Sequence, residues 1–484
     1  MASTILIILG VLLLFLLAVL LVRTAGFMKS ENSPEPAASL PVDADVVAEH
    51  LSKAVRAATP STPPNDPPAL ADMQALHSVL MWNYPNVHAL PREVINGGAL
   101  LFTWAGTNPE LPAVLFMAHM DVVPADERTL DQWTYPPFSG EIAEGFVWGR
   151  GTLDDKSSMI GILEAAEMLL KQEWQPERTI LLAFGHDEET SGNYGAISIA
   201  ERLKERGVRL AAVLDEGGAI MQGTLPGVDF PVALIGIAEK GYLTLKVWVD
   251  GKGGHSAMPP AETPIGILGR ALAKLDAHQF PARLDPLVSL YRGLGSRASF
   301  LRQMIMSNTW LFGGLIRNMV SASPSSNASI RTTMVPTMVS GGVKENILPS
   351  HAEALVNLRL LPGDTIAAVC DRVRRVINDE RVQFETVSAW EASQISNTEG
   401  EWYQSIAHAA RRCFPEAAVA PYYLMGATDS RHYRELTDEI FRFTPLPMSS
   451  EDLARVHGIN ERVSVEALAP MVQFFGQLMQ EWAK

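Results

Sequence analysis

Hydrophobic residues follow two alternating kinds of pattern over most of this chain. Runs in which nearly every residue is apolar, at residues 98–104, 113–118, 179–184 and 210–214, predict strands buried on both faces. Between and around them, helices are predicted at residues 43–58, 71–81, 157–171, 197–206 and 465–482. This order predicts an α/β fold with a central, mostly parallel sheet flanked by helices.

The pattern changes near residue 243. Residues 243–249 alternate between apolar and polar side chains, as in a strand with one exposed face. Further strands are predicted at 329–339, 352–360 and 382–390, with helices at 264–275 and 365–378. This βαββαβ order predicts an inserted α+β domain with an antiparallel, ferredoxin-like sheet at 243–390. Residues 43–242 and 391–484 are then the two parts of the α/β domain.

The N-terminal segment differs from both patterns. Residues 5–22 are apolar and uncharged, close to the ~20 residues that a helix needs to cross a bilayer. The residues before this run carry no basic side chain and no A-x-A cleavage pattern follows it, so we expect an uncleaved single-pass anchor at 1–28 and a solvated linker at 29–42. Secretion after signal cleavage is the alternative. Arg23 and Lys29 follow the span, which favours a cytoplasmic position for the rest of the chain.

Composition excludes several classes of function. The formal net charge is −15 and the pI is about 5.3, which argues against a nucleic-acid partner. The two cysteines, Cys370 and Cys413, lack CxxC partners, so the sequence offers neither a disulfide framework nor a thiolate zinc site. It also contains no Walker sequence.

Two adjacent carboxylates, Glu188 and Glu189, follow the apolar run at 179–184. Successive residues near a strand end point in different directions, so Glu189 can bind a metal while Glu188 faces a substrate. A carboxylate beside a metal-activated water is the arrangement that general-base hydrolysis requires. The structural alternative is that both acids cap the following helix.

Other strand ends and connections carry similar groups. His119 ends one strand, and the carboxylate of Asp121 can accept its second N–H. Asp154 lies in a glycine-containing connection before a helix, and Asp215 ends another strand. Each could be a helix cap or a structural residue. Their repetition at the carboxyl ends of strands, where open α/β sheets bind ligands, predicts a metal site. His457, late in the chain, suits a ligand that closes a site built from several loops.

Residues 286–319 are apolar and aromatic and carry only basic charges. We expect ordinary core helices, a helical hairpin covering the site, or a membrane-contacting face.

Together these motifs resemble the M20 metallopeptidase family, in particular the branch that contains carboxypeptidase S and the secreted N-acyl amino acid amidohydrolases. The resemblance runs from about residue 43 to the end of the chain. It rests on segments 118–124, 149–156, 184–189, 214–218, 254–260, 342–349, 357–359, 426–431 and 456–458. One departure is Ala427, where the family often has a second glycine. Residues 285–322 match no motif of the family.

The resemblance implies two zinc ions per chain, with cobalt or manganese as other possible occupants of the same ligands. One ion would be held by His119, Asp154 and Asp215, and the other by Asp154, Glu189 and His457. Asp121 would orient His119, and Glu188 would act as the general base.

The resemblance also implies roles for residues of the inserted domain. His255 resembles the catalytic histidine that, in dimeric members, reaches the partner's site and stabilises the oxyanion. Arg359 and Asn346 would bind the substrate's carboxylate and backbone. A homodimer and a hinged, lid-like closure of the inserted domain are therefore expected.

The function expected from these residues is hydrolysis of an amide bond next to a free carboxylate, in a small peptide or an N-acyl amino acid. A biosynthetic deacetylase or aminoacylase is one alternative. A non-catalytic, membrane-tethered scaffold is another, which the complete ligand set disfavours.

Overall fold

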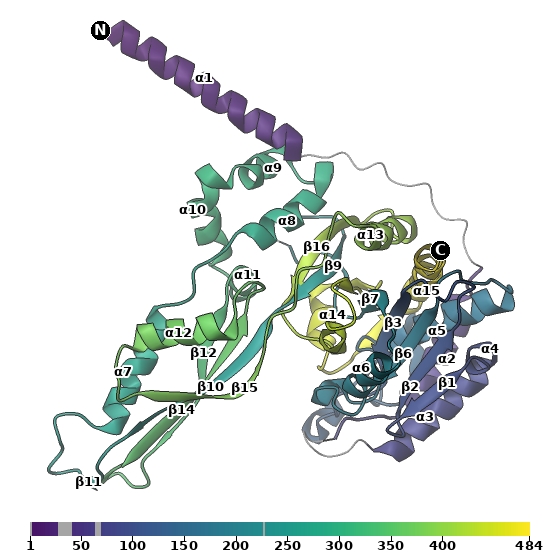
Figure 1. The fold of residues 1–484 in the computed structure, drawn as a ribbon, viewed down its shortest axis with the longest axis horizontal. Helices are drawn as coiled ribbons and strands as arrows, with labels where there is room; N and C mark the ends of the chain where they lie inside the picture. Colours follow the sequence, from purple (N-terminus) through teal and green to yellow (C-terminus); the bar gives the residue numbers. More distant parts are fainter. Residues whose placement is uncertain (1, 28–40, 63–68, 226–227) are drawn as a thin grey trace.

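A computed structural model describes residues 2–27, 41–62, 69–225 and 228–484. Residues 29–40 of the predicted linker lie outside the described residues. Figure 1 shows a larger domain on a central sheet, an elongated second domain beside it, and the N-terminal helix α1 projecting from the body.

The larger domain is built on a mixed, mostly parallel sheet of ten strands. Their order is β1-β2-β6-β3-β7-β17-β9-β8-β18, and β16 pairs with β9. In its centre, β3 runs parallel to β6 and β7, and β7 runs parallel to β17. The predicted α/β fold is confirmed. The strands are β1 (Arg92–Ile95), β2 (Ala99–Trp104), β3 (Ala113–His119), β6 (Ile180–Gly185), β7 (Leu210–Asp215), β8 (Ile220–Met221), β9 (Val232–Glu239), β16 (Ala418–Leu424), β17 (Ile440–Arg442) and β18 (Pro447–Met448).

Helices cover both faces of this sheet because its central strands are apolar on both sides. In β3, Val114 and Phe116 pack in the core with α2, α5, α13 and α15, while Leu115 and Met117 face α6. The five helices predicted in this domain are confirmed to within two residues at each end. The helices are α2 (Ala44–Arg56), α3 (Leu70–Asn83), α4 (Pro85–His88), α5 (Lys156–Lys171), α6 (Ala196–Glu205), α13 (Glu401–Cys413), α14 (Ser450–Arg455) and α15 (Val465–Trp482).

A small three-stranded sheet joins distant parts of the chain. It contains β4 (Glu141–Ala143), β5 (Phe146–Trp148) and β19 (Arg462–Ser464). Because β19 pairs with β5, with Arg462 opposite Trp148, the loop after α14 lies against the loop before α5.

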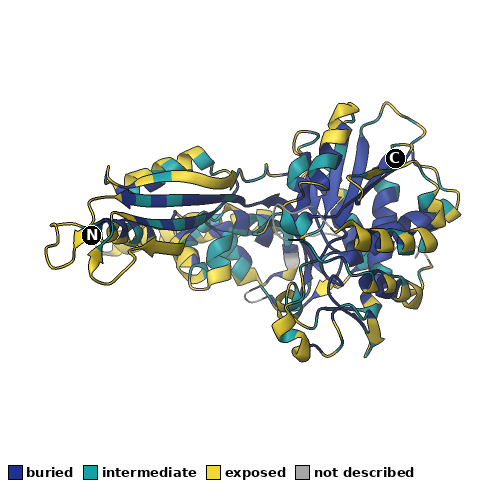
Figure 2. Cartoon of the chain, turned by 90° about the horizontal axis from the view of Figure 1, so that it is seen from below, coloured by how far each residue is buried: buried dark blue, intermediate teal, exposed yellow. Residues whose placement is uncertain are grey.

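The second domain has a four-stranded antiparallel sheet with the order β12-β14-β10-β15. Alternate residues of β14 are buried, and the residues between them, mostly half-buried, lie on the sheet's other face. Figure 2 shows the mixture of buried and exposed residues in this elongated domain. One prediction was wrong here: a strand was expected from residue 329, but residues up to Ser329 form α11, and β12 begins at Thr333. Pro324 at the first position of α11 favours a helix start. The elements are β10 (Gly241–Asp250), β11 (Gly254–His255), α7 (Pro264–Ala277), α11 (Pro324–Ser329), β12 (Thr333–Gly341), β13 (Ile347–Leu348), β14 (His351–Leu360), α12 (Ile366–Ile377) and β15 (Gln383–Trp390).

The apolar segment 286–319 forms helices α8 (Asp285–Gly293), α9 (Phe300–Ser307) and α10 (Thr309–Val320). α8 packs on the larger domain, where Gly293 meets Ala420 of β16. α9 packs on the last turns of α1 (Ala2–Phe27). Among the described residues, Ser3–Phe27 is the one helix long and apolar enough to cross a membrane.

Candidate metal centre

Three neighbouring parallel strands bring a histidine and three glutamates to one edge of the sheet. His119 ends β3, Glu188 and Glu189 follow β6, and Glu216 follows β7. The strand order β6-β3-β7 places their carboxyl ends side by side.

Asp154 lies between two imidazoles. Its Oδ1 is 2.8 Å from Nε2 of His119, and its Oδ2 is 2.9 Å from Nε2 of His457. A second carboxylate stands beside each imidazole: Glu216 Oε1 is 3.4 Å from His119 Nε2, and Glu189 Oε2 is 3.3 Å from His457 Nε2. These atoms form two groups of three, each group with its ligand atoms within 4.8 Å of one another, and Asp154 belongs to both.

The donor set fits two divalent cations that share one carboxylate. It contains nitrogen and oxygen only, which suits zinc as well as other first-row metals. Glu189 Oε1 is buried without a hydrogen-bond partner among the described residues, as expected for an oxygen that binds an ion. Burial, followed by the charge of Asp154, raises the pKa of Glu216 to about 8. So many carboxylates gathered at one buried place require positive charge to be ionised together.

The ligand expected after β7 differs from the residue found there. Glu216, rather than Asp215, enters the cluster with His119. Asp215 is buried on the other side of the strand end, where its Oδ2 accepts a hydrogen bond from the backbone N–H of Ser430 at 2.8 Å. Adjacent residues at a strand end face opposite ways, so one of the two acids reaches the centre.

Asp121 also makes contacts other than those expected from the sequence. Its carboxylate accepts the backbone N–H groups of Glu188 at 3.1 Å and Glu189 at 3.2 Å. Nδ1 of His119 lies 2.9 Å from the backbone carbonyl of Asp121 and 3.5 Å from its carboxylate. Asp121 therefore fixes the turn that carries both glutamates and, mainly through its main chain, the ring of His119.

The proton affinities of the two histidines and of Glu188 are all raised. Burial alone would lower the pKa of His119, but the carboxylates of Asp121, Asp154 and Glu216 accept hydrogen bonds from the ring and raise this pKa well above its usual value. Hydrogen bonds to Asp154 and Glu189 raise the pKa of His457 to about 10. Burial raises the pKa of Glu188 well above its usual range, against the opposing charge of His119. Bound cations would reverse this tendency, because they favour the deprotonated forms.

Glu461 is a site-building residue that the sequence did not reveal. It is fully buried, and its two carboxylate oxygens accept four hydrogen bonds from the loop before α5. The donors are Arg150 Nη1 at 2.6 Å and the backbone N–H groups of Gly151 at 3.0 Å, Leu153 at 2.8 Å and Asp154 at 3.2 Å. Glu461 thus joins the loop of His457 to the loop of Asp154. The available signal was an acid four residues after His457, but the partner lies 311 positions away.

The predicted site residues of the second domain lie in two separate places. His255 and Asn346 are exposed and meet where the N–H of Ser256 donates to the Asn346 carbonyl at 3.2 Å. Figure 1 shows β11, which pairs with β13, at the end of the second domain remote from the larger one. Arg359 lies at the opposite end of the sheet, paired with Tyr242, with its Cζ 4.7 Å from the Tyr242 ring centroid. Within one chain, neither group joins the metal centre.

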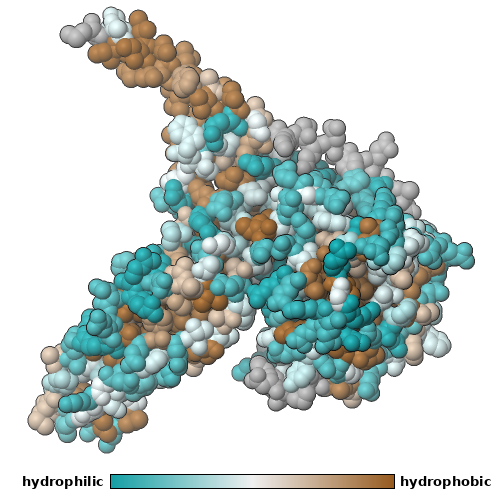
Figure 3. Space-filling model, in the orientation of Figure 1, coloured by the Kyte–Doolittle hydropathy of each residue, from teal (hydrophilic) through white to brown (hydrophobic). Residues whose placement is uncertain are grey.

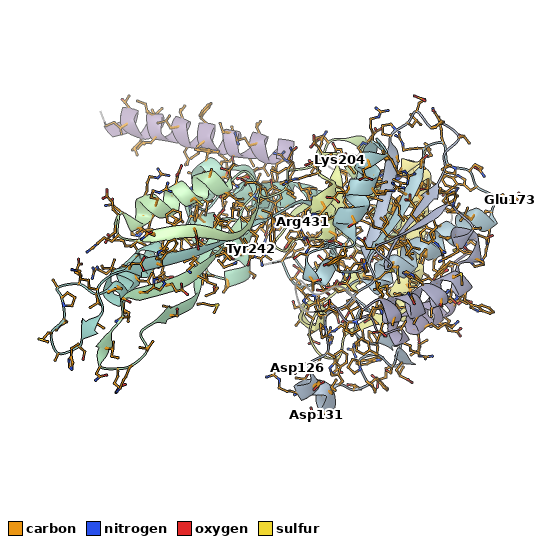
Figure 4. All side chains as sticks on the ribbon, turned by 60° about the horizontal axis from the view of Figure 1, so that its bottom comes forward. Asp126, Asp131, Glu173, Lys204, Tyr242 and Arg431 are labelled. Carbon is orange, nitrogen blue, oxygen red and sulfur yellow. The ribbon has the colours of Figure 1, made fainter. Side chains whose placement is uncertain are left out.

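A cavity of about 570 Å³ lies between the domains, lined by Trp390 on one side and by Lys204 and Arg431 on the other. Figure 4 shows Arg431 and Tyr242 at this junction. None of the five clustered ligand residues lines the cavity, so it is separate from the metal centre.

Comparison with known proteins identifies the family of the chain. Residues 115–481 match the Peptidase family M20/M25/M40. The chain is 42% identical over 394 residues, 81% of its length and 76% of the relative's, to a Xenopus tropicalis protein named N-fatty-acyl-amino acid synthase/hydrolase PM20D1. It is 36% identical over 485 residues, 98% of its length and 93% of the relative's, to a Dictyostelium discoideum protein named probable carboxypeptidase S-like 2.

Among solved structures, the fold is similar to an M20 family metallo-carboxypeptidase, Sso-CP2 from Sulfolobus solfataricus. The TM-score is 0.62 at 15% identity, over 91% of this chain and 98% of the other. The structural similarity shows the fold, and the sequence matches show the family. The chain therefore belongs to the peptidase family M20/M25/M40 and is a metal-dependent hydrolase of its carboxypeptidase S and N-fatty-acyl-amino acid hydrolase branch.

Proposed function

We propose that this chain hydrolyses the amide bond of N-acyl amino acids with long acyl chains, using two zinc ions. The observation that carries the proposal is the position of Asp154, whose two oxygens each face a different histidine. The ligands would be His119, Asp154 and Glu216 for one ion, and Asp154, Glu189 and His457 for the other. Similarity to the Xenopus N-fatty-acyl-amino acid synthase/hydrolase supports the choice of substrate.

When bound, the cations would polarise the amide carbonyl and lower the pKa of water. The chain's own residues do the remaining work. Glu188 takes a proton from the attacking water and returns it to the leaving amine nitrogen. Asp121 holds Glu188 in place through the backbone N–H that it accepts. Arg359, half-buried and stacked on Tyr242, offers a planar fork for the free carboxylate of the substrate.

A second substrate class, peptides cleaved at their C-terminal residue, is favoured by a separate observation. The Dictyostelium carboxypeptidase S-like relative matches 98% of the chain, including its N-terminal region. Both substrates present an amide next to a free carboxylate, so the same residues would serve either.

The test uses the full chain in detergent with a matched substrate pair: a long-chain N-acyl amino acid and an apolar dipeptide. The proposal is supported if the chain cleaves the acylated substrate, if a chelator abolishes this cleavage and zinc restores it, and if Glu188→Gln does not cleave the substrate. Cleavage of the dipeptide alone would assign the peptidase function instead. If cobalt or manganese but not zinc restores the activity, that metal replaces zinc in the proposal.

We also propose that two chains form the active unit. His255 and Asn346 are exposed at the remote two-stranded sheet β11–β13, where a second copy could receive them. Mixing inactive Glu188→Gln chains with inactive His255→Ala chains would then restore activity, because one of the two sites in the mixed dimer has every group intact. Absence of restoration in a confirmed mixed dimer would contradict the shared site.

For location, we propose that α1 is an uncleaved single-pass anchor. The helix Ser3–Phe27 contains an 18-residue window with a mean hydropathy of 3.6, of which 6% is buried. N-terminal sequencing of the mature chain from its native membrane tests this. A start after residue 22 would favour the secreted alternative.

A further inference from the structure

The outward face of α10 is apolar. Trp310, Leu311, Leu315 and Met319 recur at helical spacing and are 55%, 44%, 54% and 67% exposed. On the inner face, Gly313 and Ile316 are buried. A helix on a water-facing surface normally turns polar residues outward, so this face is suited to a non-aqueous neighbour.

Helix α9, which contacts α10, also exposes apolar side chains. Phe300 and Leu301 in its first turn are 52% and 60% exposed. We call these six exposed side chains the apolar patch: Phe300, Leu301, Trp310, Leu311, Leu315 and Met319.

Hydrogen bonds attach the patch to the end of α1. Thr24 Oγ1 lies 3.1 Å from Ser307 Oγ, and the Arg23 side chain donates to the Ser307 carbonyl at 3.2 Å. Asn308 Nδ2 donates to the Leu20 carbonyl at 3.4 Å. Trp310 Nε1 in turn donates to Asn308 Oδ1 at 3.2 Å. Ser307 and Asn308 thus join α1 directly to the junction of α9 and α10.

These contacts fix the depth of the patch relative to the membrane span. The uncharged run of α1 ends at Val22 and is followed by Arg23, so Leu20 to Thr24 mark one membrane–water boundary. Trp310 lies within two hydrogen bonds of Leu20 and is therefore near that boundary. Tryptophan, with an apolar ring and one N–H donor, is enriched at this level of membrane proteins.

The segment that carries the patch has basic but no acidic side chains. The whole chain has 54 acidic and 39 basic residues, yet no Asp or Glu occurs at 286–344. Helices α8 to α10 and their connections carry Arg292, Arg297, Arg302 and Arg317. Basic side chains beside an apolar helical face favour the surface of a bilayer with anionic headgroups. Figure 3 shows that the rest of the visible surface is mostly hydrophilic, with α1 as the large hydrophobic projection.

We propose that the apolar patch lies in the interface of the membrane that α1 spans, among anionic lipid headgroups, so that α9 and α10 form a second membrane contact. This inference rests on the proposed span. Because α8 also packs on β16, the contact would hold the larger domain close to the bilayer. An N-acyl amino acid with a long acyl chain partitions into the same interface, so substrate and enzyme would share one surface.

The test measures tryptophan fluorescence of the full chain in phospholipid vesicles that contain phosphatidylserine, with and without bromine on the acyl chains. Brominated lipid quenches tryptophans that touch the interface. Trp310→Phe is the test variant. Trp82→Phe is the matched control, because Trp82 is 84% exposed on α3 of the larger domain. The signal of each residue is the wild-type fluorescence minus that of its variant.

If the patch lies in the membrane interface, the Trp310 signal falls by more than half in brominated vesicles, while the Trp82 signal is unchanged. Stronger quenching by brominated phosphatidylserine than by brominated phosphatidylcholine would support the anionic preference. If brominated lipid does not quench the Trp310 signal, the proposal is wrong. A second copy of the chain covering the patch would give this result.

Alkaline extraction of the same vesicles reports on α1 independently. If the chains stay in the membrane but Trp310 is not quenched, the second contact is wrong and the proposed span of α1 is still supported. Chains released by the extraction overturn both. Hydrolysis of a water-soluble substrate is measured in parallel and is expected to be unchanged by either substitution, so the catalytic assignment is judged separately.

Discussion

Arg431 of the larger domain packs over the indole of Trp390 in the second domain, with its Cζ 5.4 Å from the ring centroid. Trp390 stacks on Tyr242 at 4.4 Å between centroids with an angle of 12° between planes. Arg359, opposite Tyr242 on the other neighbouring strand, has its Cζ 4.7 Å from the Tyr242 ring centroid. Two cations and two aromatic rings thus form one column across the domain junction. Each cation–π contact stabilises by about 0.5–2 kcal/mol, so the column favours the observed arrangement of the domains.

Removing Trp390 should loosen that arrangement. In Trp390→Ala, we expect a broader distribution of inter-domain distances, measured by pulsed dipolar spectroscopy between spin labels at exposed positions 173 and 371. Trp248→Ala is the control, because Trp248 forms a cation–π contact with Lys246 on the same sheet, within one domain. Equal broadening in both variants would mean that the effect comes from the sheet rather than the junction.

The two acids after β7 should respond differently to neutralisation. Glu216→Gln removes a ligand from the group around His119, so we expect bound zinc to fall from two ions to about one per chain after dialysis. Asp215→Asn should keep both ions, because Asp215 contacts Ser430 instead. Elemental analysis of the purified chains checks this. The reverse pattern of metal loss would restore the ligand set expected from the sequence.

Glu461→Gln should be strongly destabilising. It leaves the buried guanidinium of Arg150 without its charge partner, which typically costs about 3–5 kcal/mol. The measurement is chemical denaturation of the metal-free chain, where loss of metal cannot contribute. Asp126→Asn, which breaks an exposed pair with Arg128, is the control and should leave the midpoint unchanged. If the denaturation midpoint of Glu461→Gln equals that of this control, Glu461 does not have the structural role assigned to it.

Metal binding should release protons and weaken as pH falls. With pKa values of about 8 for Glu216 and about 10 for His457, both groups are mostly protonated at pH 7 in the metal-free chain. Both must lose a proton to bind a cation, so apparent zinc affinity should rise by at least about tenfold per pH unit near pH 7. Calorimetry in buffers of different ionisation enthalpy gives the number of protons released. A value near zero would show that these groups are already deprotonated without metal.

The sequence by itself determined the α/β fold, the extent of its main strands and helices, and the kinds of residue that form the metal centre. Periodicity reports burial locally, and buried parallel strands end at one edge of a sheet, so His119, Asp154, Glu189 and His457 could be predicted as one group. Strands β9 and β16 and helix α13 were not predicted.

The tertiary structure decided what depends on direction and on contacts between distant segments. Whether Asp215 or Glu216 lies in the cluster with His119 depends on the rotation of the strand end, which the position of an acid in the sequence does not specify. Glu461 reaches the loop of Asp154 only because β19 pairs with β5. The outward apolar face of α10 and its attachment to α1 through Ser307 and Asn308 arise in the same way. Composition cannot separate an apolar core helix from an apolar exposed one, because burial is set by what packs against the helix.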